Sequence, residues 1–194
     1  MRTTGFLLGL GMLIPAVSMA EEVRQHGSHV HGESVLNIAI EGKVIDMELH
    51  APGADTVGFE YPASSPEDRE AVQRAVGLLQ QGGKVLALSP EAGCDLERSD
   101  VHLSQEPDAH EDDDHGHDDH DEDHDEDEQA DHNEFLVTYR FGCADPDALE
   151  RIDLNFFDLF PYSQKLKIQL ITGSGAHAFD ATRDRSRFNL PDSR

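Results

Sequence analysis

Alternating apolar and polar positions predict a β-hairpin near the start of the chain. Residues 34–41 and 43–50 each place an apolar side chain at every second position, and Gly42 separates the two runs. A period of two residues is typical of strands that are buried on one face, and glycine suits the tight turn between them. With a two-residue turn Val35 pairs with His50, and this pairing sets the register of the whole hairpin.

A helical period follows in residues 65–79 and predicts one amphipathic helix. Ser65 is a favoured N-cap residue, Pro66 suits the first turn, and Gly82 with Gly83 marks the end of the helical pattern. The apolar face comprises Ala71, Val72, Ala75, Val76 and Leu79.

Shorter apolar or alternating runs predict further strands downstream. They cover residues 84–88, 94–103, 134–143, 151–157 and 165–172. Because one helix is set among many strands, we expect an α+β fold that is mainly antiparallel β-sheet with one helix.

The chain has two cysteines, and they lie at the outer ends of two predicted strands of equal length. Cys94 begins the first of these strands, and Cys143 ends the second. An antiparallel pairing with Leu103 opposite Glu134 also brings the two cysteines together. In an oxidising compartment such a pair forms a disulfide by default, so we expect a disulfide-clamped hairpin.

The segment between these two strands differs in composition from the rest of the chain. Residues 106–132 contain 16 Asp or Glu residues, six histidines and no Lys or Arg. This stretch has almost no apolar residue with which to build a core. We therefore expect residues 104–133 to form a disordered loop inserted in the hairpin.

Residues 1–20 have the features of a secretory signal peptide. A positive charge precedes an apolar run over residues 6–14, and Ser18 and Ala20 are the small residues that a signal peptidase reads. The apolar run is shorter than the roughly 20 residues that span a bilayer. We expect cleavage after Ala20, export to the bacterial periplasm, no membrane insertion, and a single mature domain over residues 21–194.

The net charge of the chain indicates which classes of ligand it attracts. The chain has 15 Lys or Arg residues against 40 Asp or Glu residues, a formal net charge of −25. Such a charge repels nucleic acid and anionic lipid and attracts cations. We therefore expect metal ions, and no nucleic acid, among the ligands.

The six histidines of the acidic loop predict metal binding. Imidazole and carboxylate donors suit Zn(II), although Cu(II), Ni(II) and Co(II) use the same donors and selectivity stays open. Ordering a flexible chain opposes binding, so we expect several weak, exchangeable sites. The alternative is an acidic tract that only keeps the chain in solution. The predicted loop ligands are His110, His115, His117, His120, His124 and His132.

A second histidine cluster lies between the signal peptide and the first strand. It comprises His26, His29 and His31, and in an extended chain the last two point to one side. The predicted hairpin register places Glu48 and His50 on that same sheet face, opposite the core. We therefore predict an ordered zinc site in which His50 joins the N-terminal histidines; the alternative is an exposed terminus that is rich in histidine by chance.

The remaining residues predict a binding protein and not an enzyme. His102 lies within a predicted strand and His177 near a turn, so we expect surface or packing roles for both. The chain contains no motif of a serine, cysteine or helix-borne zinc hydrolase. Two alternatives stay open: a zinc-dependent hydrolase built from scattered His and Asp residues, and an acidic interaction module that docks a basic partner.

Taken in order along the chain, these features resemble a known family. They are the histidines of residues 26–31, the Gly-Phe-Glu of residues 58–60, a lone helix, and a His-rich loop between two cysteines. The combination is similar to the ZrgA-type periplasmic zinc-uptake proteins. The resemblance implies a zinc-binding accessory that holds Zn(II) for a periplasmic zinc-binding protein and an ABC transporter. The ligands that the resemblance implies are His26, His29 and His31 and, less closely, the loop histidines. Tyr61 and Pro62 follow the Gly-Phe-Glu where a histidine is expected, so the resemblance assigns no metal ligand near Glu60.

Overall fold

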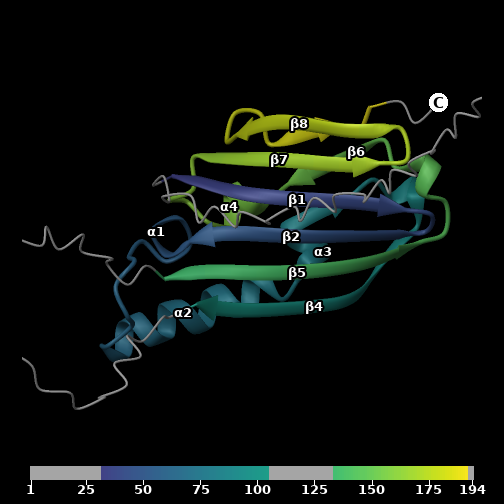
Figure 1. Ribbon diagram of the computed structural model, residues 1–194. Helices are drawn as coiled ribbons and strands as arrows, with labels where there is room; N and C mark the ends of the chain where they lie inside the picture. The colour runs from purple at the N-terminus through teal and green to yellow at the C-terminus, as the bar shows by residue number, and fades with distance from the viewer. Residues whose placement is uncertain (1–31, 105–132, 192–194) are drawn as a thin grey trace, which may run out of the picture.

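The computed structural model describes residues 32–104 and 133–191 and contains one large sheet (Figure 1). Its six strands have the order β4-β5-β2-β1-β7-β8. Neighbouring strands are antiparallel except β1 and β7, which run parallel. The expected α+β class with a mainly antiparallel sheet is therefore confirmed. The strands are β1 Glu33–Glu41, β2 Val44–Pro52, β4 Cys94–Ser104, β5 Glu134–Cys143, β7 Lys165–Thr172 and β8 Gly175–Thr182.

The first hairpin has the predicted register. Val35 pairs with His50, and Glu41 pairs with Val44 across the turn. The alternating apolar residues of both strands are buried, as Leu36 and Met47 illustrate. The residues between them form the opposite face of the sheet, which we call the outer face.

The second hairpin, β4–β5, confirms the disulfide but corrects the register at its open end. Cys94 and Cys143 face each other and are bonded. Leu103 pairs with Phe135 and not with Glu134, because β4 contains an irregularity between Leu96 and Arg98 that adds one residue to that strand. A bulge of this kind needs space for the extra side chain. That space is present because the strand opposite has a glycine, Gly142, at the position where a Cβ atom would collide with Glu97.

Helix α2, Pro66–Leu79, begins and ends close to the predicted positions. The Ser65 side chain accepts from the backbone N–H of Asp68, and the Asp68 carboxylate accepts from the backbone N–H of Ser65. This reciprocal capping box satisfies donors that the first turn leaves unpaired. At the other end, the hydroxyl of Tyr139 donates to the carbonyl of Leu79 at 2.6 Å inside the core.

Several short elements differ from the prediction. Helix α3, Gly82–Val85, replaces the start of the expected strand 84–88, and its first residue, Gly82, lies so close to the Tyr139 ring that a side chain would collide with it. Helix α4, Phe156–Leu159, replaces the end of the expected strand 151–157, since the phenylalanine rings around it pack together in the core. Two strands, β8 and β9, were not predicted. The remaining elements are α1 Gly53–Thr56, β3 Leu86–Leu88, η1 Pro90–Ala92, η2 Pro146–Ala148, β6 Arg151–Leu154 and β9 Arg187–Asn189.

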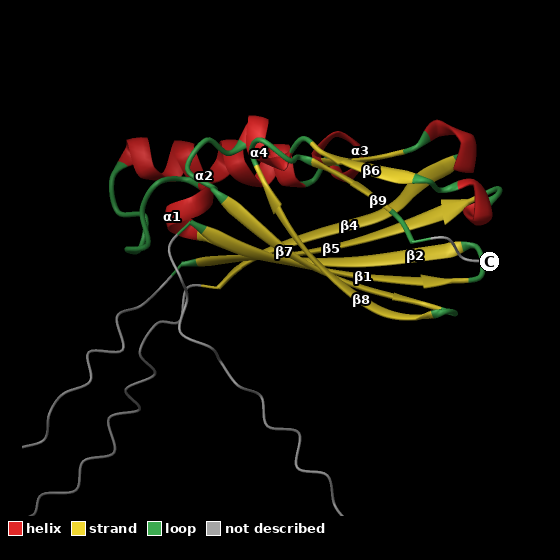
Figure 2. Ribbon diagram, turned by 90° about the horizontal axis from the view of Figure 1, so that it is seen from above, coloured by secondary structure: helices red, strands yellow, loops and turns green. Residues whose placement is uncertain are grey.

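The helices and a second sheet cover only one face of the large sheet (Figure 2). This second sheet has the order β3-β6-β9 and is antiparallel. The core lies between the two layers, where Leu36, Phe135 and Phe156 are fully buried. The outer face of the six-stranded sheet therefore carries polar side chains that solvent can reach. Across residues 32–104 and 133–191, no helix has the length and apolar character needed to cross a bilayer.

Candidate functional site

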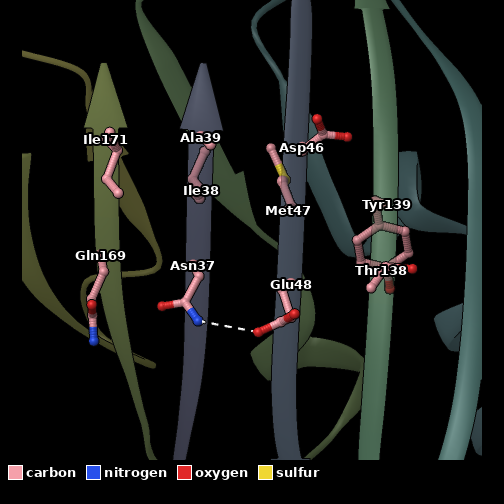
Figure 3. Close-up of a pocket in the computed structure, with 10 residues that line it drawn as sticks. All are labelled: Asn37, Ile38, Ala39, Asp46, Met47, Glu48, Thr138, Tyr139, Gln169 and Ile171. Atoms are coloured by element: carbon pink, nitrogen blue, oxygen red, sulfur yellow. Dashed lines mark hydrogen bonds between the residues drawn. The ribbon is translucent and has the colours of Figure 1, made fainter. Parts of the chain in front are cut away.

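A shallow groove crosses the outer face of the large sheet (Figure 3). It has a volume of about 420 Å³, and its outward-facing lining includes Asn37, Glu48, Thr138 and Gln169. Asn37 donates through Nδ2 to Oε1 of Glu48 at 3.5 Å. Glu48 therefore lies at the border between the groove and the histidine that follows two residues later on β2.

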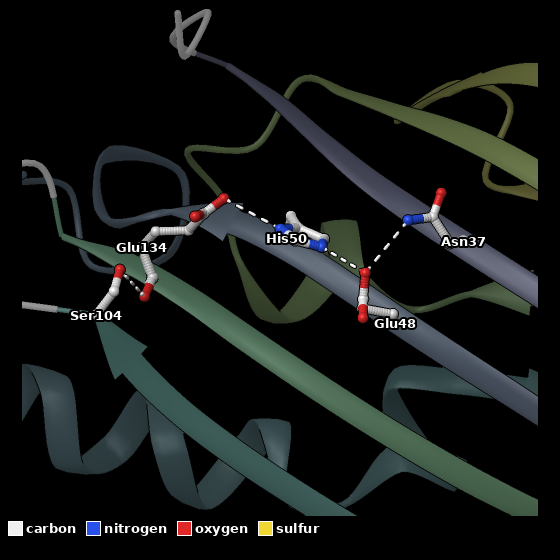
Figure 4. Close-up of polar contacts among 5 residues, drawn as sticks. All are labelled: Asn37, Glu48, His50, Ser104 and Glu134. Atoms are coloured by element: carbon white, nitrogen blue, oxygen red, sulfur yellow. Dashed lines mark hydrogen bonds and ion pairs between the residues drawn. The ribbon is translucent and has the colours of Figure 1, made fainter. Parts of the chain in front are cut away.

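This histidine, His50, lies between two carboxylates at one end of the outer face (Figure 4). Strand β2 supplies Glu48 and His50, which project from the same face because they are two residues apart. Strand β5 begins with Glu134 and pairs with the end of β2, where Glu134 is opposite Pro52. The site thus joins two segments that are distant in the sequence.

Both ring nitrogens of His50 have a carboxylate close to them. Nε2 lies 2.7 Å from Oε1 of Glu48, and Nδ1 lies 3.5 Å from Oε1 of Glu134. The Ser104 hydroxyl donates to the main-chain carbonyl of Glu134 at 3.2 Å and holds the start of β5 against β4. The exposed fractions of the side chains are 34% for His50, 46% for Glu48 and 22% for Glu134, so ions can reach the ring from solvent.

The two carboxylates raise the pKa of His50 to about 9. The contact with Glu134 is the largest cause, partial burial of the ring opposes it, and the contact with Glu48 adds to the rise. Glu134 is the less exposed of the two carboxylates, so water screens its charge less. Without a metal ion, His50 therefore carries a positive charge at neutral pH.

This raised pKa predicts a pH-dependent contribution of His50 to stability. The free histidine pKa is about 6.5, so the ion pairs contribute fully below that pH and their contribution is lost as the pH rises through about 9. We expect His50→Gln to lower the free energy of unfolding of chelator-treated protein by about 1 kcal/mol at pH 6, and by less at pH 10. Urea unfolding at both pH values measures this, and a cost that does not change with pH would contradict it.

The chain enters the described region close to this site. The backbone N–H of Gly32, the residue after His31, donates to Oδ1 of Asp55 at 2.7 Å. The Ser34 hydroxyl donates to the other oxygen of this carboxylate at 3.0 Å. Asp55 is 1% exposed and belongs to α1, which directly follows β2. Helix α1 therefore holds the point at which the N-terminal histidine segment joins the sheet.

The same segment after β2 also holds the chain where the acidic loop ends. The N–H of Asn133 donates to the Glu60 carbonyl at 2.9 Å, and its carbonyl accepts from the N–H of Gly53 at 2.6 Å. Its side chain donates to the Tyr61 carbonyl. A Cβ atom at Gly53 would lie 2.4 Å from the Phe59 carbonyl oxygen, so glycine is required there. Residues 53–61 therefore hold Gly32 and Asn133, which follow the two histidine-bearing segments in the sequence, beside β2.

The structure places His50 and Glu48 as the hairpin register predicted, and their binding of a metal ion stays a prediction. His50 and Glu48 lie on the predicted face, with Glu33, which contacts Lys165 and Lys167. Within residues 32–104 and 133–191, no group of three or more His, Cys, Asp or Glu side chains is placed to hold a metal ion. The other predicted ligands lie outside the described residues: His26, His29, His31, His110, His115, His117, His120, His124 and His132.

The two remaining histidines are not part of this site. His102 is exposed on β4, and in the sheet register Leu136 separates it from His50. His177 lies on the core side of β8 and stacks on Phe179, with 6.4 Å between the ring centres. The sequence analysis missed Glu134, Asp55 and Asn133, because their contacts depend on which strands become neighbours.

Comparison with known protein families identifies the family of this chain. The family model for ZrgA family zinc uptake proteins matches residues 28–190, which is most of the chain and includes every residue of the His50 site. No curated protein matches the chain. The matched range also contains the disulfide, helix α2 and the acidic segment. The chain therefore belongs to the ZrgA family of zinc uptake proteins.

Proposed function

We propose that this protein binds Zn(II) in the bacterial periplasm and holds it for a high-affinity zinc import system. The observation that carries the proposal is His50, which lies between Glu48 and Glu134 at the sheet end where both histidine-bearing segments join the described chain. Membership of a zinc uptake family supports the choice of metal. The disulfide supports an oxidising compartment, since such bonds are rare in the cytosol.

Two classes of zinc ligand have different roles in this function. Acidic residues of the loop raise the local concentration of cations, and its six histidines capture Zn(II) weakly and reversibly. His50 needs no ordering, because β2 pairs with β1 on one side and β5 on the other. Together with His26, His29 and His31 it forms the tighter site.

The captured metal leaves by transfer to a partner. A periplasmic zinc-binding protein and its ABC transporter are the expected receivers. Weak loop sites exchange Zn(II) quickly, and the exposed edge of the His50 ring allows a receiver's donors to approach. The signal peptide predicted over residues 1–20 brings the chain to the compartment in which these receivers operate.

A zinc titration of the mature chain, residues 21–194, against a chelator of known affinity tests the proposal. At pH 7.5 we expect uptake of Zn(II) at micromolar concentrations. At pH 5 the affinity should fall at least about tenfold, because a protonated imidazole has no lone pair for the metal. Equal affinity at both pH values would argue against histidine ligation. No uptake at pH 7.5 would overturn the proposal as a whole.

A further inference from the structure

We infer that His50 and Glu48 form a preorganised two-donor half-site for Zn(II), and that Glu134 is the carboxylate that positions the ring. The inference rests on the proposed function and assigns separate roles to residues within its tighter site. In these roles Nε2 of His50 and a carboxylate oxygen of Glu48 bind the metal ion, whereas Glu134 acts only through His50.

The spacing of the two donors fits a zinc ion after a small movement. Nitrogen and oxygen ligands bind zinc at about 2.0–2.2 Å, so two donors on a tetrahedral ion lie about 3.4 Å apart. His50 Nε2 and Glu48 Oε1 are 2.7 Å apart, so the pair must open by about 0.7 Å. The Glu48 side chain is 46% exposed and its bond from Asn37 is long at 3.5 Å, so it can rotate outward while its backbone stays paired with β1 and β5.

Glu134 approaches the ring from the other side and so has a different role. It faces Nδ1 at 3.5 Å, and the two ring nitrogens point in different directions. A carboxylate that accepts from Nδ1–H keeps the proton on that nitrogen and leaves the Nε2 lone pair for the metal. Glu134 is also only 22% exposed, and the Ser104 hydroxyl bonds to its main-chain carbonyl. The backbone of Glu134 is therefore held in place beside the ring.

The half-site leaves room for further donors. A tetrahedral zinc ion takes four ligands, and in residues 32–104 and 133–191 no group of three or more His, Cys, Asp or Glu side chains is placed to hold one ion, since Glu134 faces the other ring nitrogen. The ring is 34% exposed, so other donors reach the metal from the solvent side. The two ordered donors fix the position of the ion, and the remaining coordination positions stay available to further ligands.

Four variants of the full mature chain separate these roles. We expect Glu48→Gln to weaken binding of the first zinc equivalent about tenfold or more, because it removes a ligand. Glu134→Ala should weaken it 10- to 100-fold, the usual effect of losing such an outer partner. Glu134→Gln should stay within a few-fold of the unsubstituted protein, because the amide oxygen still accepts from Nδ1–H. Glu41→Gln makes the same charge change at the far end of β1 and should have no effect.

The outcomes distinguish this inference from the proposed function. Unchanged first-equivalent affinity in Glu48→Gln and Glu134→Ala, with normal zinc uptake by the unsubstituted chain, overturns the inference and leaves the function standing. A Glu134→Gln variant as weak as Glu134→Ala overturns the positioning role, since charge alone would then explain the effect. Nitrogen NMR of His50 in the unsubstituted chain tests the two roles without any variant. On addition of zinc, the Nε2 resonance must shift while Nδ1 stays protonated.

Discussion

Deleting residues 106–132 is expected to remove several zinc equivalents per chain while the fold stays intact. The deleted segment carries six of the 12 histidines and 16 of the 40 acidic residues. Its removal leaves the β4–β5 pairing unchanged up to Ser104 and Glu134, and Asn133 keeps its contacts with residues 53–61. Chelator-competition titration gives the stoichiometry, and far-UV circular dichroism with thermal unfolding reports on the fold.

A matched variant separates the imidazoles from the carboxylates of the loop. Replacing only the six loop histidines by asparagine keeps the length and the negative charge of the segment. We expect this variant to lose nearly as many zinc equivalents as the deletion, because carboxylates alone favour harder cations. A deletion that leaves the zinc stoichiometry unchanged would show that the loop captures no metal. Loss of a partner's binding without loss of zinc would instead favour an acidic interaction module.

Replacing Cys94 and Cys143 by alanine is expected to lower the free energy of unfolding by about 4 kcal/mol. The two cysteines are 49 residues apart in sequence, so their bond closes a long ring in the unfolded chain and restricts its conformations. In the loop-entropy estimate a ring of this size corresponds to that value. Urea unfolding under non-reducing conditions measures the difference.

Combining this substitution with the loop deletion tests the physical origin of the stabilisation. The deletion removes 27 residues from the ring that the disulfide closes. The cost of losing the disulfide should then be smaller by about 0.7 kcal/mol, because the shorter ring restricts the unfolded chain less. Equal costs in the two backgrounds would mean that the bond acts mainly through the folded hairpin.

Local patterns were sufficient to predict much of the fold. The β1–β2 register follows from alternation and a two-residue turn, because both strands are adjacent in sequence. Ser65 and Pro66 predicted the start of α2, because helix capping also involves only residues that are close in sequence. The disulfide was predictable because the chain has only two cysteines. The predicted register of the β1–β2 hairpin explains why His50 was assigned to the correct face.

Long-range contacts could not be predicted in the same way. The bulge at Glu97 adds one residue to β4, and nothing in the alternating pattern marks it. The parallel pairing of β1 with β7 joins strands from opposite ends of the described chain. An alternating strand specifies which side chains face the core but does not specify its neighbour, because any similar strand satisfies the same backbone hydrogen bonds.

The His50 site likewise combines features that the sequence predicted with contacts that it did not. The local negative charge and the outward direction of Glu48 and His50 followed from residue type and strand periodicity. The approach of Glu134 to the ring, and the fastening of both chain entry points by residues 53–61, depend on the order of strands in the sheet. That order is set by the packing of the whole core, so only the folded chain places a second carboxylate beside His50.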